Sequence, residues 1–336
     1  MSTVALRTYA APLMDLIEQG GVSELSVNRP GEVWLEIGDS MERLEVPLLT
    51  LDHLKQLARL IAQYSEQVIS EEQPLLSATL PGGYRVQVVY PPAVEPATIA
   101  LSIRRQAIYD IGLEKWPTLT YDASCLTNAA AEDTDCHLRE LHATTRFTDF
   151  ITAAVRARKN ILISGGTSTG KTTFLNACLK HIPSVERIIT IEDAREVYPQ
   201  HPNRLHLLAS RGDQGRAKVT AQQLLEASLR LRPDRIILGE IRGTECVSYW
   251  SAINSGHPGS LTSVHADTPQ LAFEKLVMLG MQSGLGFTRA HIVDYLRTTV
   301  DVVVQLARDG AKRRHISNVW YVSGSTHSYV DGGLHA

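Results

Sequence analysis

The chain has 336 residues, of which 43% are hydrophobic and 21% are charged, as expected of a globular protein with about two domains. Its net charge of -3 excludes a global electrostatic drive toward nucleic acid or acidic membranes. The apolar runs are too short to span a membrane, and residues 1–7 lack the pattern of a signal peptide. The four cysteines show no metal-binding spacing, so we expect reduced thiols and a cytoplasmic protein.

Residues 1–110 show the pattern of an α+β domain of their own. Apolar residues at helical spacing predict helices over 9–19 and 50–64, the second of them capped by Thr50. Short runs bounded by glycine and proline turns predict strands over 24–28, 32–37, 43–46, 75–80, 84–90 and 98–103.

Residues 111–144 show no sustained period and are interpreted as a linker, apart from a helical turn at 138–141. Cys125 and Cys136 lie in this stretch, and the sequence assigns them no role. A basic run at 312–314, late in the chain, is interpreted as a solvated turn, and a contact with a membrane or a partner is the alternative.

Residues 145–336 alternate between helical and strand patterns, which predicts an α/β domain with a mainly parallel sheet. A helix around Phe150 precedes a strand that ends at Ser164, and Thr220, Thr268 and Thr288 begin three later helices. Further strands are expected over 187–191, 204–208, 235–238, 261–265 and 300–306.

A complete G-x-x-x-x-G-K-[ST] motif follows the strand that ends at Ser164, and a helical pattern follows the motif. This strand–loop–helix context favours a phosphate-binding loop over a turn without a ligand. Its backbone N–H groups and the helix N-terminus suit a triphosphate, Lys171 suits the β/γ-phosphates, and the Thr172 hydroxyl suits Mg²⁺. The residues expected to bind ATP here are Gly165, Gly166, Thr167, Ser168, Thr169, Gly170, Lys171, Thr172 and Thr173.

Three more predicted strands end in groups that phosphoryl chemistry uses, namely Glu192-Asp193, Glu240 and His265. The carboxyl ends of parallel strands meet at one edge of a sheet, where ligands bind. Gly239 stands where P-loop enzymes usually place a metal-binding aspartate, so Mg²⁺ is expected on Thr172 with Glu192 or Asp193.

The remaining groups of this edge have expected roles in catalysis. Glu240 is the candidate that activates water, with Glu192 as the alternative. His265 is the candidate that senses the γ-phosphate, and a core histidine is the alternative reading.

These motifs resemble the Walker A, acidic, atypical Walker B and histidine boxes of the type II/IV secretion ATPase superfamily. The segments that carry the resemblance are Thr190–Asp193, Leu231–Arg242 and Gly256–Ala266. Segments 24–34, 74–85 and 101–104 resemble, within it, the traffic ATPases of type IV secretion systems.

The resemblance implies a homohexamer of two stacked rings, with ATP and Mg²⁺ held between two domains and N-terminal arginines on the nucleotide. The matching positions are Arg85 and Arg104, which otherwise read as surface charges. It also implies a RecA-like ATPase domain, a peripheral position on the cytoplasmic face of the bacterial inner membrane, and other inner-membrane and ATPase components as partners. Pilus assembly and export of protein or DNA–protein substrates are the implied work, without sequence-specific nucleic-acid binding.

Other classes of function remain open at this point. A pilus or type II secretion motor of the same superfamily is the nearest alternative, although the tetracysteine zinc insert of some members is absent. A P-loop kinase would need an arginine-rich lid, which the sequence does not show. A nucleotide-gated scaffold that barely turns over is opposed by Glu240 and Glu192.

Overall fold

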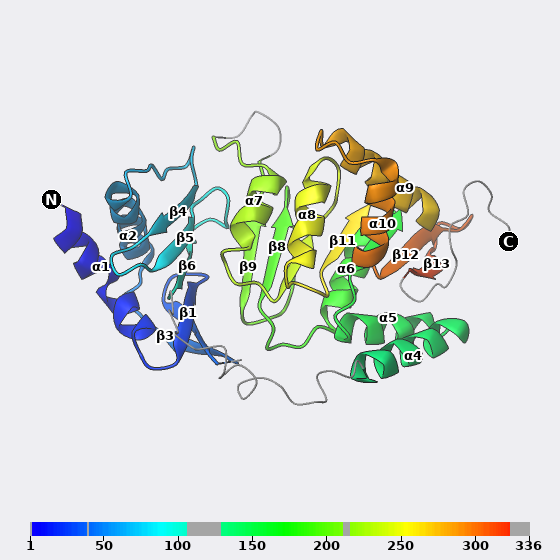
Figure 1. The fold of residues 1–336 in the computed structure, drawn as a ribbon, viewed down its shortest axis with the longest axis horizontal. Helices are drawn as coiled ribbons and strands as arrows, with labels where there is room; N and C mark the ends of the chain where they lie inside the picture. The colour runs from blue at the N-terminus through cyan, green and yellow to red at the C-terminus, as the bar shows by residue number, and fades with distance from the viewer. Residues whose placement is uncertain (1, 39, 106–128, 211–215, 323–336) are drawn as a thin grey trace, which may run out of the picture.

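The computed structural model describes residues 2–38, 40–105, 129–210 and 216–322. Its elements form two sheets that lie side by side, each with its own helices (Figure 1). In the described part, no helix is long and apolar enough to cross a membrane.

The N-terminal sheet is antiparallel, with the strand order β3-β2-β1-β6-β5-β4. Apolar side chains of its strands and helices α1 and α2 form one buried cluster. The elements are α1 (Ser2–Ile17), β1 (Val22–Val27), β2 (Glu32–Ile37), β3 (Ser40–Glu45), α2 (Leu51–Tyr64), β4 (Leu75–Thr79), β5 (Arg85–Val89) and β6 (Ala100–Arg104).

Helix α1 begins seven residues earlier than the predicted helix over 9–19. Leu6, Ala10, Leu13 and Ile17 are all buried and share one face, so the apolar stripe continues past Pro12. Helix α2 agrees with its prediction, because the Thr50 hydroxyl accepts a hydrogen bond from the N–H of His53 and caps the helix.

The second sheet has the order β13-β12-β7-β11-β10-β8-β9, and it is parallel except for the edge strand β13. Helices α4, α5 and α6 pack on one face, and α7 to α10 cover the other. The elements are α4 (Ala129–Ala143), α5 (Phe147–Arg156), β7 (Ile161–Gly165), α6 (Lys171–Leu179), β8 (Ile188–Glu192), β9 (Arg204–Leu208), α7 (Ala221–Ser228), β10 (Arg235–Leu238), α8 (Glu245–Asn254), β11 (Leu261–Val264), α9 (Pro269–Gln282), α10 (Arg289–Thr299), β12 (Val302–Arg308) and β13 (Arg314–Tyr321).

The interpretation of 129–143 as linker with only one helical turn is wrong, because these residues form α4. Leu138 and Leu141 are buried against α5, and the His142 ring bonds to the Val319 carbonyl of β13. The rest of the predicted linker, with Cys125, lies outside the described residues, and Cys136 is exposed on α4. The domain boundary near residue 110 therefore stays a prediction.

The basic run at 312–314 lies where β12 turns into β13, an edge strand that the sequence did not predict. Lys312 and Arg313 are exposed, and Arg313 pairs with Asp309 across the turn. This agrees with the expected solvated turn for Lys312 and Arg313, whereas Arg314 Nε donates to the Ser168 carbonyl of the P-loop at 3.2 Å.

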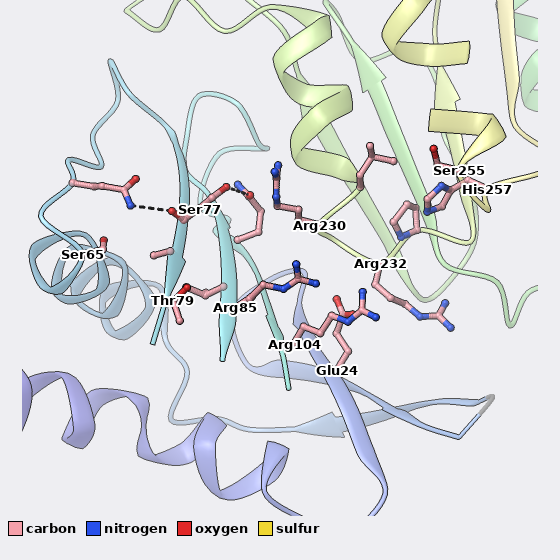
Figure 2. A pocket seen from close by; sticks show the side chains of 16 residues that line it. Glu24, Ser65, Ser77, Thr79, Arg85, Arg104, Arg230, Arg232, Ser255 and His257 are labelled. Atoms are coloured by element: carbon pink, nitrogen blue, oxygen red, sulfur yellow. Dashed lines mark hydrogen bonds between the residues drawn. The ribbon is translucent and has the colours of Figure 1, made fainter. Parts of the chain in front are cut away.

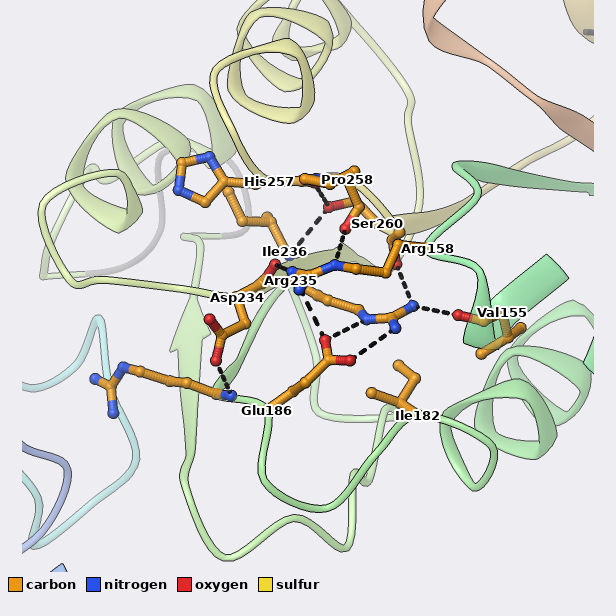
Figure 3. A network of polar contacts seen from close by, with 12 residues as sticks. Val155, Arg158, Ile182, Glu186, Asp234, Arg235, Ile236, His257, Pro258 and Ser260 are labelled. Atoms are coloured by element: carbon orange, nitrogen blue, oxygen red, sulfur yellow. Dashed lines mark hydrogen bonds and ion pairs between the residues drawn. The ribbon is translucent and has the colours of Figure 1, made fainter. Parts of the chain in front are cut away.

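A buried polar network fixes the amino-terminal edge of the second sheet (Figure 3). The Arg235 side chain is fully buried, and its guanidinium donates to both oxygens of Glu186 at 2.6 and 2.9 Å and to the Val155 carbonyl at 2.7 Å. A buried charge is tolerated only when it is paired and hydrogen-bonded in this way. The network thus anchors β10, whose other end carries Glu240.

Polar contacts also join the two sheets. The buried Arg187 donates to the side-chain oxygen of Asn28 at 2.7 Å, and Arg232 pairs with Glu36. The N–H of Leu208 donates to the Ala93 carbonyl at 2.8 Å, so an N-terminal segment adds to the β9 edge.

Candidate functional site

The P-loop connects β7, whose residues are all buried, to helix α6 at the carboxyl edge of the parallel sheet. Gly165 is required by close packing, since a Cβ there would lie 2.4 Å from Thr169 Oγ1 and 2.9 Å from the Leu306 carbonyl oxygen. The Thr169 hydroxyl donates to the Gly166 carbonyl at 2.9 Å. The P-loop is therefore tightly packed between the end of β7 and the start of α6.

Lys171 is the one charged residue of the loop Gly165–Thr173, and 8% of its surface is exposed. Its ammonium donates to the carbonyls of Gly165 at 3.0 Å and Gly166 at 3.2 Å. Burial lowers the pKa of Lys171, and the charge of Glu240 opposes that shift. The ammonium is thus held at the mouth of the loop by the residues that form it.

His265 links Lys171 to the acidic groups of the neighbouring strands. Its Nδ1 lies 3.1 Å from Lys171 Nζ, and its Nε2 lies 3.2 Å from Glu240 Oε1. Burial lowers the pKa of His265, the largest of several effects on it. A neutral ring suits both contacts, since Nδ1 then accepts from the ammonium while Nε2–H donates to the carboxylate.

Arg242 continues these polar contacts along the edge of the sheet. Its guanidinium bonds to Glu240 Oε2 at 2.9 Å and to Asp193 Oδ2 at 2.6 Å. Lys171, His265, Glu240, Arg242 and Asp193 therefore form one continuous polar row. Sequence reasoning missed Arg242, although it lies in the box that carried the family resemblance.

Glu192 is placed differently from the other acidic residues. It is 7% exposed, and its Oε1 accepts the N–H groups of Glu196 and Val197, each at 2.9 Å. Its Oε2 is buried with no hydrogen-bond partner in the described part of the chain. Burial raises the pKa of Glu192 to about 7, against the effect of the two backbone hydrogen bonds. One carboxylate oxygen of Glu192 thus holds the following loop by hydrogen bonds, and the other has no hydrogen-bond partner among the described residues.

We expect Glu192→Gln to become progressively more stable relative to wild type as pH rises from about 4.5 to about 7. In this window the unfolded wild type has lost the proton that the folded carboxyl retains, so ionisation of Glu192 weakens folding. Glutamine keeps the oxygen that accepts both N–H groups and does not titrate. Urea unfolding of both proteins at several pH values measures the difference, and a pH-independent difference would show that Glu192 does not hold this proton.

Mg²⁺ is expected from the sequence on Thr172 with Glu192 or Asp193, and hydroxyl and carboxylate oxygens are ligands of the kind that this ion takes. It usually takes one or two protein oxygens together with waters and substrate phosphates. Among residues that the structure describes, no three His, Cys, Asp or Glu side chains are grouped to hold a metal by themselves. The Thr172 hydroxyl instead lies 3.3 Å from Glu196 Oε2, a carboxylate that the sequence analysis did not single out.

Arg85 and Arg104 do not meet the P-loop of their own chain. They are register partners on β5 and β6 and line a cavity of about 700 Å³ between the two sheets (Figure 2). Arg230 and Arg232, which precede β10, also line it, and Glu24 is the one carboxylate among its described lining residues. The P-loop lies at the carboxyl ends of the parallel strands, whereas residues that precede a strand lie at the opposite edge of the sheet.

A mainly parallel sheet with helices on both faces, a P-loop after a central strand, and carboxylates and a histidine after its neighbours define a RecA-like P-loop nucleotide-binding protein. Residues 7–329 match the family described as Type II/IV secretion system protein. The chain belongs to this family.

Relatives with nearly the same length resemble the whole chain. The type IV secretion system protein VirB11 of Bartonella quintana is 37% identical over 334 residues, covering 95% of this chain and 94% of that protein. PtlH of Bordetella pertussis, another type IV secretion system protein, is 38% identical over 314 residues, covering 90% and 91%. The crystal structure of the Brucella suis VirB11 ATPase with sulphate has a TM-score of 0.87, 35% identity and 95% coverage of both chains.

Proposed function

We propose that this protein is an ATPase that hydrolyses ATP with Mg²⁺ to power a type IV secretion system. The observation that carries the proposal is the continuous row from Lys171 through His265 to Glu240 beside the P-loop. The relatives named as type IV secretion proteins favour this function over that of a pilus or type II secretion motor. We propose that its ATP hydrolysis powers pilus assembly and the export of protein or DNA–protein substrates.

Each group of the row has a role in hydrolysis. Lys171 offsets charge on the β/γ-phosphates, and bound Mg²⁺ would supply further charge neutralisation there. Glu240 orients and activates the attacking water, held in place by Arg242 and His265. His265 connects Lys171 to Glu240, and Arg242 connects Glu240 to Asp193. Loss of the γ-phosphate therefore changes the charge next to Lys171, at one end of this hydrogen-bonded path.

The assembly is proposed to be a homohexamer at the cytoplasmic face of the inner membrane, in contact with other components of the secretion apparatus. The position of Arg85 and Arg104 favours an assembly in which copies share sites. These arginines line a cavity whose described lining residues include no residue of the P-loop, and Glu24 is the one carboxylate among them. We therefore assign them to the nucleotide bound by a neighbouring copy, where each guanidinium stabilises the transferring phosphoryl group.

Mixing two inactive variants tests this function together with its shared sites. Arg85→Ala alone should release phosphate at least ~10²-fold more slowly than wild type, since an arginine on the phosphoryl group is worth ~10³-fold or more. Lys171→Ala alone should be inactive. In mixed assemblies, the intact P-loop of the first variant meets the intact arginines of the second, so activity should return.

Arg230→Ala provides a matched control at the same cavity, because this arginine lies in the turn after α7, on the same side of the cavity as the P-loop domain. Its assemblies should gain nothing from mixing with Lys171→Ala beyond the activity they already have. Failure of Arg85→Ala and Lys171→Ala to complement, with both proteins assembled, would contradict the sharing of sites between copies.

A further inference from the structure

The loop that follows β11 carries His265, and its backbone is held against the strand that leads into the P-loop. The Ala266 carbonyl accepts hydrogen bonds from the Ser164 hydroxyl at 3.3 Å and from Gln305 Nε2 at 3.1 Å. Ser164 and Gln305 are register partners on β7 and β12, and both are buried. The sheet thus fixes the backbone of this loop one residue after His265.

The same loop is held from the side of helix α9 by Lys275. Its ammonium donates to the His265 carbonyl at 3.0 Å. The Thr268 hydroxyl caps α9, and Ala272 and Leu276 are buried, so the start of the helix and its rotation are both fixed. Side chains on a helix lean toward its amino terminus, so Lys275 extends back along α9 toward the loop. This contact places a positive charge next to the backbone of His265.

The ring of His265 is surrounded by charges from several neighbouring elements. Lys171 of α6 and Glu240 after β10 contact its two nitrogens, and Arg242 bonds to Glu240. Burial has the largest effect on the pKa of His265 and lowers it, whereas the charge of Glu240 raises it. The charges of Lys171, Lys275 and Arg242 lower this pKa. Unlike Lys171, Lys275 bonds to the backbone of His265, so its charge can be removed without breaking a contact of the ring.

We propose that Lys275 is a positioning residue of the ATPase site, which holds the backbone of His265 in place and keeps its ring neutral. A neutral ring accepts from Lys171 at Nδ1 while it donates to Glu240 at Nε2. A protonated ring carries a hydrogen on both nitrogens, so it cannot accept from the ammonium and the link to Lys171 is lost. The inference rests on the proposed function, since His265 belongs to the same site. Lys275 therefore extends the pH range of hydrolysis toward acid.

The first test compares the pH dependence of single-turnover phosphate release by full-length wild type, Lys275→Met and Lys275→Arg. Methionine keeps most of the side-chain stem and removes the charge, so the pH below which the rate falls should rise. At the pH where wild type keeps half of its plateau rate, Lys275→Met should keep about a quarter or less of its own plateau, and Lys275→Arg should keep about half. Lys180→Met removes a positive charge from the other end of α6 and should match wild type.

The second measurement reads the ring of His265 directly and does not depend on turnover. The ring signals of the 12 histidines are followed by NMR against pH, and the signal that His265→Gln lacks is assigned to His265. In Lys275→Met this signal should titrate at a higher pH than in wild type, because a nearby positive charge no longer opposes protonation. In Lys275→Arg it should titrate as in wild type.

The outcomes separate this role from a purely structural one. An unchanged titration of His265 in Lys275→Met, or the same shift in Lys275→Arg, would overturn the inference. An equal change in the pH profile when Lys275→Met is made in a His265→Gln background would also overturn it, because Lys275 would then act on another group such as Glu240. A wild type that releases no phosphate would instead contradict the proposed function, and the NMR titration would still test Lys275.

Discussion

Lys171→Ala is expected to abolish phosphate release while leaving the protein folded. The side chain lies at the mouth of the P-loop and holds its ammonium beside His265. Removal of a preorganised charge that stabilises a phosphoryl group costs at least ~10²-fold in rate. Phosphate release from ATP, with circular dichroism and thermal unfolding as checks on the fold, measures the effect.

Lys180→Ala is the matched control, because Lys180 is an exposed lysine at the other end of helix α6. It should hydrolyse ATP at the wild-type rate. Unchanged phosphate release by folded Lys171→Ala would show that hydrolysis occurs at another site.

Glu240→Gln is expected to bind ATP and to hydrolyse it at least ~10²-fold more slowly, a loss typical of a missing general base. Glutamine keeps the volume and accepts a hydrogen bond from Arg242, but it cannot take a proton from water. Single-turnover phosphate release, with nucleotide affinity measured separately, distinguishes lost chemistry from lost binding.

Glu192→Gln in the same assay decides between the two carboxylates. The structure favours Glu240, because Glu192 already accepts two backbone N–H groups and its raised pKa keeps it partly protonated near neutral pH. Turnover near wild type in Glu240→Gln, with slow turnover in Glu192→Gln, would transfer the role to Glu192.

The sequence was sufficient to predict a feature wherever the residues that form it are close together in the chain. The P-loop, the strand ends at Glu240 and His265, and the caps Thr50, Thr220, Thr268 and Thr288 depend on neighbours within a few residues, and the structure places them as expected. The parallel sheet followed from the alternation of helical and strand patterns.

What the sequence left out depends on contacts between distant segments. Helix α4 is held to the fold by Leu138 and Leu141, which meet α5. The partner of Glu196 is 24 residues away on α6, and the place of Arg85 depends on how the two sheets pack. A pattern of single residues carries no information about such placements.

The central claim, that this chain is an assembled ATPase, is tested most directly by phosphate release from full-length protein in fractions of measured mass. Purified wild type is separated by size with ATP and Mg²⁺, and each fraction is assayed by light scattering and phosphate release. Hydrolysis per site should be concentrated in fractions with the mass of a hexamer, because Arg85 and Arg104 lie away from the P-loop of their own chain. Equal hydrolysis per site by the monomer, or an assembled ring that releases no phosphate, would contradict the account.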